Sequence, residues 1–194
     1  MSLERFLGLV VEVLNAVGVP FMLTGSLAGS YHGAPRATQD IDLIVETDLP
    51  SLLRLTEGLR HAGLYVSDEA VREAFEVRGQ FNAIDPSSGW KADLILRKAR
   101  LFSEEEFRRR QPFTFLGLDL SVVSAEDLVI AKLEWARLGD SERQVRDVAE
   151  ILAVQGDSLD MPRIEKWVRE FGLDDLWSRA LSFRARPPDP TNSA

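Results

Sequence analysis

Two aspartates, Asp40 and Asp42, interrupt an apolar segment formed by Ile41, Leu43 and Val45. Side chains alternate across a strand, so the two acids share one face and the apolar residues take the other. Their backbone positions then lie about 6.5 to 7 Å apart, a span suited to hard divalent cations, which prefer oxygen ligands. Aspartate is disfavoured inside strands, and the alternative is a pair of solvated acids at a strand edge. The spacing favours a metal site.

A Gly-Ser pair precedes these acids. The apolar run at 21–23 predicts a buried strand that ends at Gly25 and Ser26, and the small residues of 27–33 predict a short helix. Backbone N–H groups at such a junction form a natural phosphate site. Gly25 lets the backbone approach the phosphates closely, and Ser26 adds a hydroxyl where the helix dipole favours negative charge. A phosphate site facing two carboxylates indicates metal-assisted chemistry on a nucleoside triphosphate (NTP).

A third acid, Asp93, lies within the apolar run 90–96 and is expected on a neighbouring strand. Asp85 is the competing candidate, but it precedes Pro-Ser-Ser-Gly and is better explained as a turn former. Two metal ions about 3.5 to 4 Å apart can stabilise both the attacking and the leaving oxygen of a phosphoryl displacement. We therefore expect Asp40 and Asp42 to bridge two Mg²⁺ ions. Asp93 is expected to hold the ion nearer the acceptor hydroxyl, which is the group that attacks the phosphate, and to help deprotonate this hydroxyl.

The composition limits the classes of function. The chain has 194 residues, a formal net charge of −8 and no cysteines. Disulfides and thiolate metal sites are excluded, which fits a reducing compartment, and we expect a cytoplasmic protein. The apolar positions of the first residues, MSLERFLGLVVEVLNAVGV, follow a helical period that Glu4 and Glu12 interrupt, so we expect an amphipathic helix there. No apolar stretch of the sequence is long enough to span a bilayer. The negative charge lowers the expectation of broad nucleic-acid binding, so an RNA acceptor would be held at one end or loop.

The pattern along the chain predicts an α+β fold, with a mixed sheet flanked by helices and followed by a C-terminal helical bundle. A capping box at Ser103 and Glu106 predicts a helix start. Three tryptophans, Trp135, Trp167 and Trp177, are expected in the core. Helices are expected at 3–17 and 51–61, strands at 21–23, 40–45, 81–85, 90–96, 113–116 and 118–123, and helices alone from Ser124. The predicted division is an α/β core at 1–123, a helical domain at 124–185 and a flexible tail at 186–194.

The order of these residues resembles a known signature. Gly25-Ser26, followed after thirteen residues by Asp40-Ile41-Asp42, is similar to the motif of the nucleotidyltransferase superfamily built on the polymerase beta fold. The fuller string, which adds Ala28, His32-Gly33, Arg36 and Thr38, resembles the AbiEii/AbiGii-like nucleotidyltransferases. These are the toxin halves of bacterial type IV toxin–antitoxin and abortive-infection pairs.

The resemblance adds residues to the predicted site. It implies that Arg36 holds triphosphate oxygens, where the alternative is a surface arginine. Segment 124–133 resembles the family segment in which a lysine, here Lys132, contacts the triphosphate or the acceptor. Segment 146–151 resembles the family's Lys-Asp-x-x-Asp-Ile string and implies that Asp147 orients this lysine or the base. This chain has Arg and Glu where the family often has the Lys and the second Asp, and a lysine on an amphipathic helix is ordinarily solvated.

The predicted activity is transfer of a nucleoside monophosphate (NMP) from an NTP to an acceptor hydroxyl, with release of pyrophosphate. The resemblance implies an RNA (tRNA) or protein acceptor and a separately encoded antitoxin as partner. One basic cluster, at 108–110, either guides an RNA acceptor or is a solvated helix end. A second hypothesis is a small-molecule enzyme like the aminoglycoside nucleotidyltransferases, because an acidic surface suits a cationic acceptor. A third is a nucleotide-binding regulator without turnover, against which the intact acidic triad argues.

Overall fold

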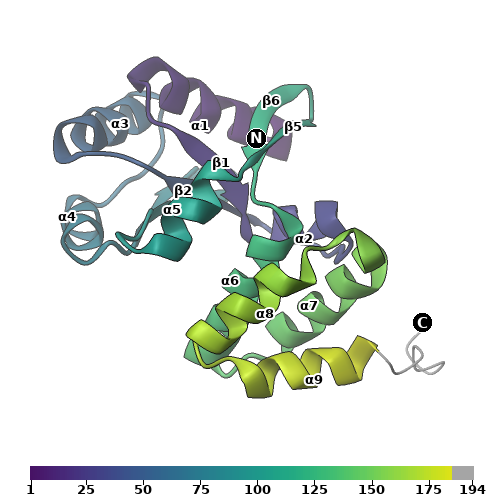
Figure 1. Cartoon of the computed structure of the whole chain (residues 1–194). Helices are drawn as coiled ribbons and strands as arrows, with labels where there is room; N and C mark the ends of the chain where they lie inside the picture. The colour runs from purple at the N-terminus through teal and green to yellow at the C-terminus, as the bar shows by residue number, and fades with distance from the viewer. Residues whose placement is uncertain (185–194) are drawn as a thin grey trace. The chain divides into compact units, whose positions relative to one another are not determined.

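The computed structural model describes residues 1–184, so the predicted tail at 186–194 lies outside the described residues. Contacts group the chain into two units (Figure 1). Of the described residues, the first unit comprises 1–28 and 36–124, and the second comprises 29–35 and 125–184. No helix of the described chain combines the length and the apolar character needed to cross a membrane.

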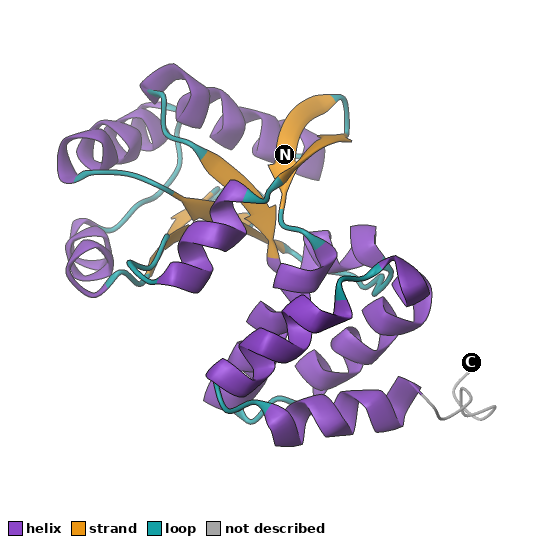
Figure 2. Ribbon diagram, viewed as in Figure 1, coloured by secondary structure: helices purple, strands orange, loops and turns teal. Residues whose placement is uncertain are grey.

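The first unit contains a mixed sheet, whose strands are orange in Figure 2. Its six strands have the order β3-β4-β2-β1-β6-β5. Its two central pairings join β2 to β1 in antiparallel and to β4 in parallel orientation. The outer hairpins, β3–β4 and β5–β6, are antiparallel, and β1 pairs with β6 in parallel. The strands are β1 (Phe21–Thr24), β2 (Asp40–Val45), β3 (Gln80–Ile84), β4 (Lys91–Leu96), β5 (Gln111–Phe115) and β6 (Leu118–Val122).

Strand β2 forms at the residues predicted, and its two faces differ in burial as predicted. Ile41, Leu43 and Val45 are fully buried, whereas Asp40 and Asp42 are partly exposed. Burying an aliphatic side chain of this size contributes about 1.5–3 kcal/mol, so the apolar face fixes the register of the strand in the sheet. The acids are thereby held on the opposite face.

Helices of the first unit form where amphipathic patterns are capped. The side chain of Ser2 accepts a hydrogen bond from the Arg5 N–H at the start of α1, and Gly18 closes the helix in a left-handed conformation. Helix α1 packs against α3. The helices of this unit are α1 (Leu3–Val17), α3 (Leu49–His61), α4 (Asp68–Val77) and α5 (Leu101–Arg108), with the start of α2 (Gly25–His32).

The predicted capping box at Ser103 and Glu106 is wrong. Helix α5 begins earlier, with Arg100 at its N-cap, and both Ser103 and Glu106 are buried within the helix. Phe102 and Phe107 are 1% and 4% exposed, so burial of these rings sets where the helix lies. The Arg100 Nε group donates a hydrogen bond to Ser103 Oγ, which therefore does not act as a cap.

The second unit is helical, as predicted for the C-terminal part of the chain. Helix α6 packs against α7, α8 and α9, which appear in green to yellow in Figure 1. Trp167 and Trp177 are buried, but Trp135 is 48% exposed, so its predicted core position is wrong. The helices are α6 (Ala125–Gly139), α7 (Glu142–Gln155), α8 (Met161–Glu170) and α9 (Asp174–Arg184), with a short 3-10 turn at Gly156–Ser158.

Candidate active site

The register between β2 and β4 places the predicted acids together. Asp42 is the Cα partner of Asp93, and Asp40 is the partner of Lys91. Partners in adjacent strands lie about 4.8 Å apart with their side chains on the same face of the sheet. Asp40, Asp42 and Asp93 therefore share one face, and Lys91 lies on it with them.

Lys91 links two of these carboxylates. Its Nζ lies 3.3 Å from Asp93 Oδ2 and 3.5 Å from Asp40 Oδ1. Sequence reasoning missed Lys91 as a site residue. The available signal was its two-residue spacing from Asp93, which matches the spacing of Asp40 from Asp42 and puts both on one strand face. That the lysine reaches Asp40 follows only from the pairing of β2 with β4.

Asp93 is the most buried of the three acids. It is 8% exposed, and within residues 1–184 its Oδ1 is a buried oxygen without a hydrogen-bond partner. Burial raises the pKa of the Asp93 carboxyl, the charge of Lys91 opposes this, and the charge of Asp40 adds to it. Burial lowers the pKa of the Lys91 ammonium, but the charges of Asp93 and Asp40 outweigh it and raise the pKa overall. The face thus carries a carboxylate that is costly to keep ionised without a cation.

The turn at Gly25 lies directly against Asp42. Thr24, the last residue of β1, is the register partner of Asp42, and Gly25 follows with a φ of 63°. A Cβ at Gly25 would lie 1.9 Å from Asp42 Oδ2, so no other residue fits without moving the carboxylate. The Ser26 N–H donates to the same Oδ2 at 3.4 Å. Glycine is required here both for its backbone conformation and for close approach.

Arg36 lies beside this turn, because its Nη2 donates a hydrogen bond to Ser26 Oγ. Ser26 is 7% exposed and Arg36 is partly buried. That Arg36 holds triphosphate oxygens stays a prediction. The structure brings Gly25, Ser26, Arg36 and Asp42 together. The guanidinium and the N–H groups of this turn are the chemistry that recognises phosphate oxygens.

The carboxylates of this face are suitable ligands for a hard divalent cation, although the described residues do not form a complete metal site. Among residues 1–184, no three or more His, Cys, Asp or Glu side chains are gathered into a metal-binding group. The ammonium of Lys91 lies against Asp40 and Asp93 instead. Carboxylate oxygens are the ligands Mg²⁺ prefers, and the unpartnered Oδ1 of Asp93 has capacity for a cation. The carboxylates of Asp40, Asp42 and Asp93 therefore have the chemistry that a divalent cation needs.

Lys132 and Asp147 form a buried ion pair in the second unit. The Lys132 Nζ lies 2.7 Å from Asp147 Oδ2 and donates to Gln144 Oε1 at 3.1 Å. Their side chains are 3% and 9% exposed, so the alternative of a solvated lysine is wrong. A Cβ at Gly29 would lie 3.3 Å from Lys132 Cε, which places the lysine stem against α2.

Burial raises the pKa of the nearby Glu150 carboxyl, the charge of Asp147 raises it further, and the charge of Lys132 opposes both effects. The role of the pair toward a nucleotide stays a prediction.

Asp85 behaves as the turn former that was predicted. Its carboxylate accepts hydrogen bonds from the N–H and Oγ of Ser87 and from Ser88 Oγ. Hydrogen bonding by Ser88 and then by Ser87 lowers the pKa of Asp85, against the opposing effect of burial.

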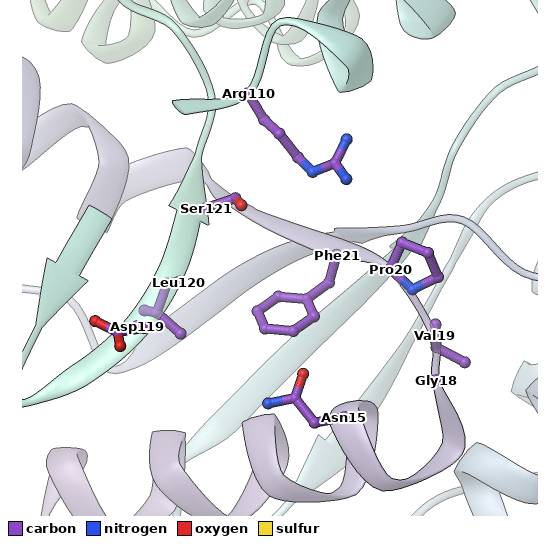
Figure 3. Close-up of a pocket in the computed structure, with 9 residues that line it drawn as sticks. All are labelled: Asn15, Gly18, Val19, Pro20, Phe21, Arg110, Asp119, Leu120 and Ser121. Carbon is purple, nitrogen blue, oxygen red and sulfur yellow. The ribbon is translucent and has the colours of Figure 1, made fainter. Parts of the chain in front are cut away.

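A pocket of about 370 Å³ in the first unit contains none of the predicted site residues (Figure 3). Phe21 lies at the beginning of β1, whereas the partner of Asp42 lies at its end, and alternation puts Phe21 on the opposite face. The pocket is therefore separate from the acidic face. Its lining residues are Asn15, Gly18, Val19, Pro20, Phe21, Arg110, Asp119, Leu120 and Ser121.

No protein-family profile matches the chain, and no curated protein matches it. Solved structures do match. The antibiotic-resistance factor ANT(2'')-Ia is 12% identical with a TM-score of 0.51, over 94% of this chain and 91% of that one. A nucleotidyltransferase-like antigenic protein from Paracoccidioides brasiliensis is 14% identical with a TM-score of 0.52, over 92% of each chain. The lincosamide antibiotic adenylyltransferase LnuA is 10% identical with a TM-score of 0.52, over 79% of this chain and 98% of that one. At these identities the likeness establishes the fold alone: the chain has a nucleotidyltransferase-type α+β fold.

Proposed function

We propose that the protein is a metal-dependent nucleotidyltransferase that moves NMP from an NTP to an acceptor hydroxyl. The observation that carries the proposal is the pairing of Asp42 with Asp93, with the Gly25 turn packed against the same Asp42 carboxylate. A carboxylate face next to a phosphate-binding turn is the arrangement that nucleotidyl transfer needs. The fold shared with ANT(2'')-Ia and LnuA supports the same class of reaction.

The three acids of this face and the donors beside the Gly25 turn each have a role in the proposal. Asp40, Asp42 and Asp93 would hold two Mg²⁺ ions, which supply charge stabilisation to the attacking and leaving oxygens. Ser26 and Arg36 would bind triphosphate oxygens through the turn N–H groups, the hydroxyl and the guanidinium fork. Mutual placement of acids and donors orients the triphosphate before the reaction begins.

The transfer is a displacement at the α-phosphorus of the NTP. The acceptor oxygen forms a bond to the α-phosphorus while the bond from that phosphorus to the β-bridging oxygen breaks, and pyrophosphate leaves. The acceptor hydroxyl loses its proton, and the buried carboxylate of Asp93 is the proposed group to receive it. We also propose that Lys132 and Asp147 take part in the reaction, which is supported by the sequence resemblance and by their burial as a hydrogen-bonded pair.

For the acceptor, we propose RNA or protein and a role as the toxin of a toxin–antitoxin pair, supported by the sequence resemblance of residues 25–42. A small-molecule acceptor is the second candidate. It is supported by the likeness to an antibiotic-resistance factor and to a lincosamide adenylyltransferase, and by the net charge of −8.

The experiment incubates the full chain with each α-labelled NTP and Mg²⁺, together with total tRNA, a protein extract or an aminoglycoside and lincosamide panel. Label in tRNA or protein supports the toxin proposal, whereas label in an antibiotic supports the second candidate. NTP binding without pyrophosphate release from any mixture would contradict the enzyme proposal and favour a nucleotide-binding regulator. Expression in a bacterium, with growth as the readout, tests toxicity separately.

A further inference from the structure

Lys91 occupies the position where a cation would be expected. Its ammonium contacts one carboxylate oxygen of Asp93 and one of Asp40, at 3.3 Å and 3.5 Å. These two acids lie on different strands, so the lysine joins β4 to β2 across the acidic face. The proposed mechanism assigns no role to this side chain.

We infer that the Lys91 ammonium and a divalent cation are alternative partners for Asp40 and Asp93, so that Lys91 weakens cation binding by the nucleotide-free protein. The inference rests on the metal site of the proposed function. Mg²⁺ binds oxygen at about 2.0–2.1 Å, so its ligand oxygens would have to leave the ammonium and close around the ion. Two cations within a few ångströms also repel each other strongly in a partly buried site.

The exposures of the three side chains favour exchange over permanent blockage. The side chain of Asp93 is 11% exposed, whereas the side chains of Lys91 and Asp40 are 28% and 49% exposed. The Lys91 side chain is therefore more exposed than that of Asp93, and its ammonium is at the end of a flexible four-carbon stem that can move away. In the metal-free protein the same ammonium reduces repulsion among the three carboxylates. Removing it is thus expected to tighten cation binding and to lower the stability of the metal-free chain.

The test measures Mn²⁺ binding to the nucleotide-free full chain by electron paramagnetic resonance of the free ion. Lys91→Gln removes the charge, and Lys91→Arg keeps it. Lys98→Gln is the matched control, because Lys98 is exposed and its loss changes the net charge equally. We expect Lys91→Gln to lower the Mn²⁺ dissociation constant by about tenfold, the order expected from removing one competing charge. Lys98→Gln should stay within about twofold of the parent, as should Lys91→Arg.

Asp42→Asn separates the two proposals. If the parent binds Mn²⁺ at a site that Asp42→Asn removes, but Lys91→Gln binds it equally or more weakly, the inference about Lys91 is overturned and the metal site stands. If Mn²⁺ binding is insensitive to Asp42→Asn, the metal site itself fails, and the inference fails with it. The Mn²⁺-induced rise in melting temperature provides a second readout, and it should be larger for Lys91→Gln than for the parent even if the variant is less stable.

Discussion

Asp42 and Asp93 are register partners in the parallel pairing of β2 with β4, so two carboxylates lie side by side on one face of the sheet. Like charges directly opposite each other destabilise a sheet. The nearby ammonium of Lys91 contacts Asp93 Oδ2, but Asp93 Oδ1 has no hydrogen-bond partner within residues 1–184. The arrangement therefore costs folding stability, which is typical of residues retained for function.

Asp93→Asn tests this cost. Burial raises the pKa of Asp93, so its ionised form opposes folding at neutral pH, and the neutral amide removes that opposition. We expect the free energy of unfolding of the metal-free protein to rise by about 0.5–1 kcal/mol in urea denaturation, while transfer activity is lost. A clear fall in stability would mean that Asp93 is a structural residue of the sheet.

Gly25→Ala tests the close approach of the turn to Asp42. A methyl group there would meet Asp42 Oδ2 at 1.9 Å, so the carboxylate must move. Gly172→Ala is the control, because Gly172 has a φ of 61° but nothing within 4 Å of its added Cβ. Both variants should lose about 1–2 kcal/mol from the left-handed backbone, but only Gly25→Ala should also lose binding of a fluorescent NTP analogue. Equal NTP binding by the two variants would contradict the proposed phosphate turn.

The Lys132–Asp147 pair predicts a coupled stability effect. Lys132→Met leaves a buried carboxylate without its cation, so we expect a loss of about 3–5 kcal/mol in urea denaturation. Adding Asp147→Asn neutralises that carboxylate and should recover part of the loss. Strictly additive losses in this double-mutant cycle would show that the two groups do not stabilise each other in solution.

The same double variant separates a structural role from a catalytic one. If Lys132 and Asp147 serve the reaction, the variant that regains stability still lacks transfer activity. Recovery of activity together with stability would assign the pair to folding alone.

Asp85 predicts a pH dependence of stability. Hydrogen bonds from Ser88 and Ser87 lower the pKa of Asp85 below its ordinary value of 3.8. A lowered folded-state pKa contributes stability that is present above the unfolded-state pKa and is lost as the pH falls through the folded-state pKa. Asp85→Asn should therefore melt at a lower temperature than the parent at pH 7, with the gap closing below about pH 4. A gap of constant size down to pH 2 would contradict this origin.

Local patterns predicted the parts of the site that lie within one element. The alternation of acids and aliphatic residues predicted both the bounds of β2 and the shared face of Asp40 and Asp42, since a period of two depends only on neighbouring residues. The Gly-Ser pair likewise predicted the end of β1 at a helix start. The fold class followed from the order of such elements.

The features that the sequence did not predict depend on the pairing of distant strands and on burial in the folded chain. The contact of Lys91 with Asp40 depends on the register of two strands that are distant in sequence. Ser103 and Glu106 have the spacing of a capping box, but burial of neighbouring aromatic rings places them inside α5. Trp135 follows a helical apolar pattern, yet within residues 1–184 it is 48% exposed.

In the proposed function, nucleotidyl transfer requires the Asp42 carboxylate. The most direct measurement is single-turnover release of pyrophosphate from an NTP by the parent, by Asp42→Asn and by Asp119→Asn, a control that replaces an exposed aspartate of the same sheet. We predict a fall of about 10³-fold or more for Asp42→Asn at a melting temperature no lower than that of the parent, and a rate within about twofold of the parent for Asp119→Asn. Release by folded Asp42→Asn at the parental rate would contradict a catalytic role for Asp42.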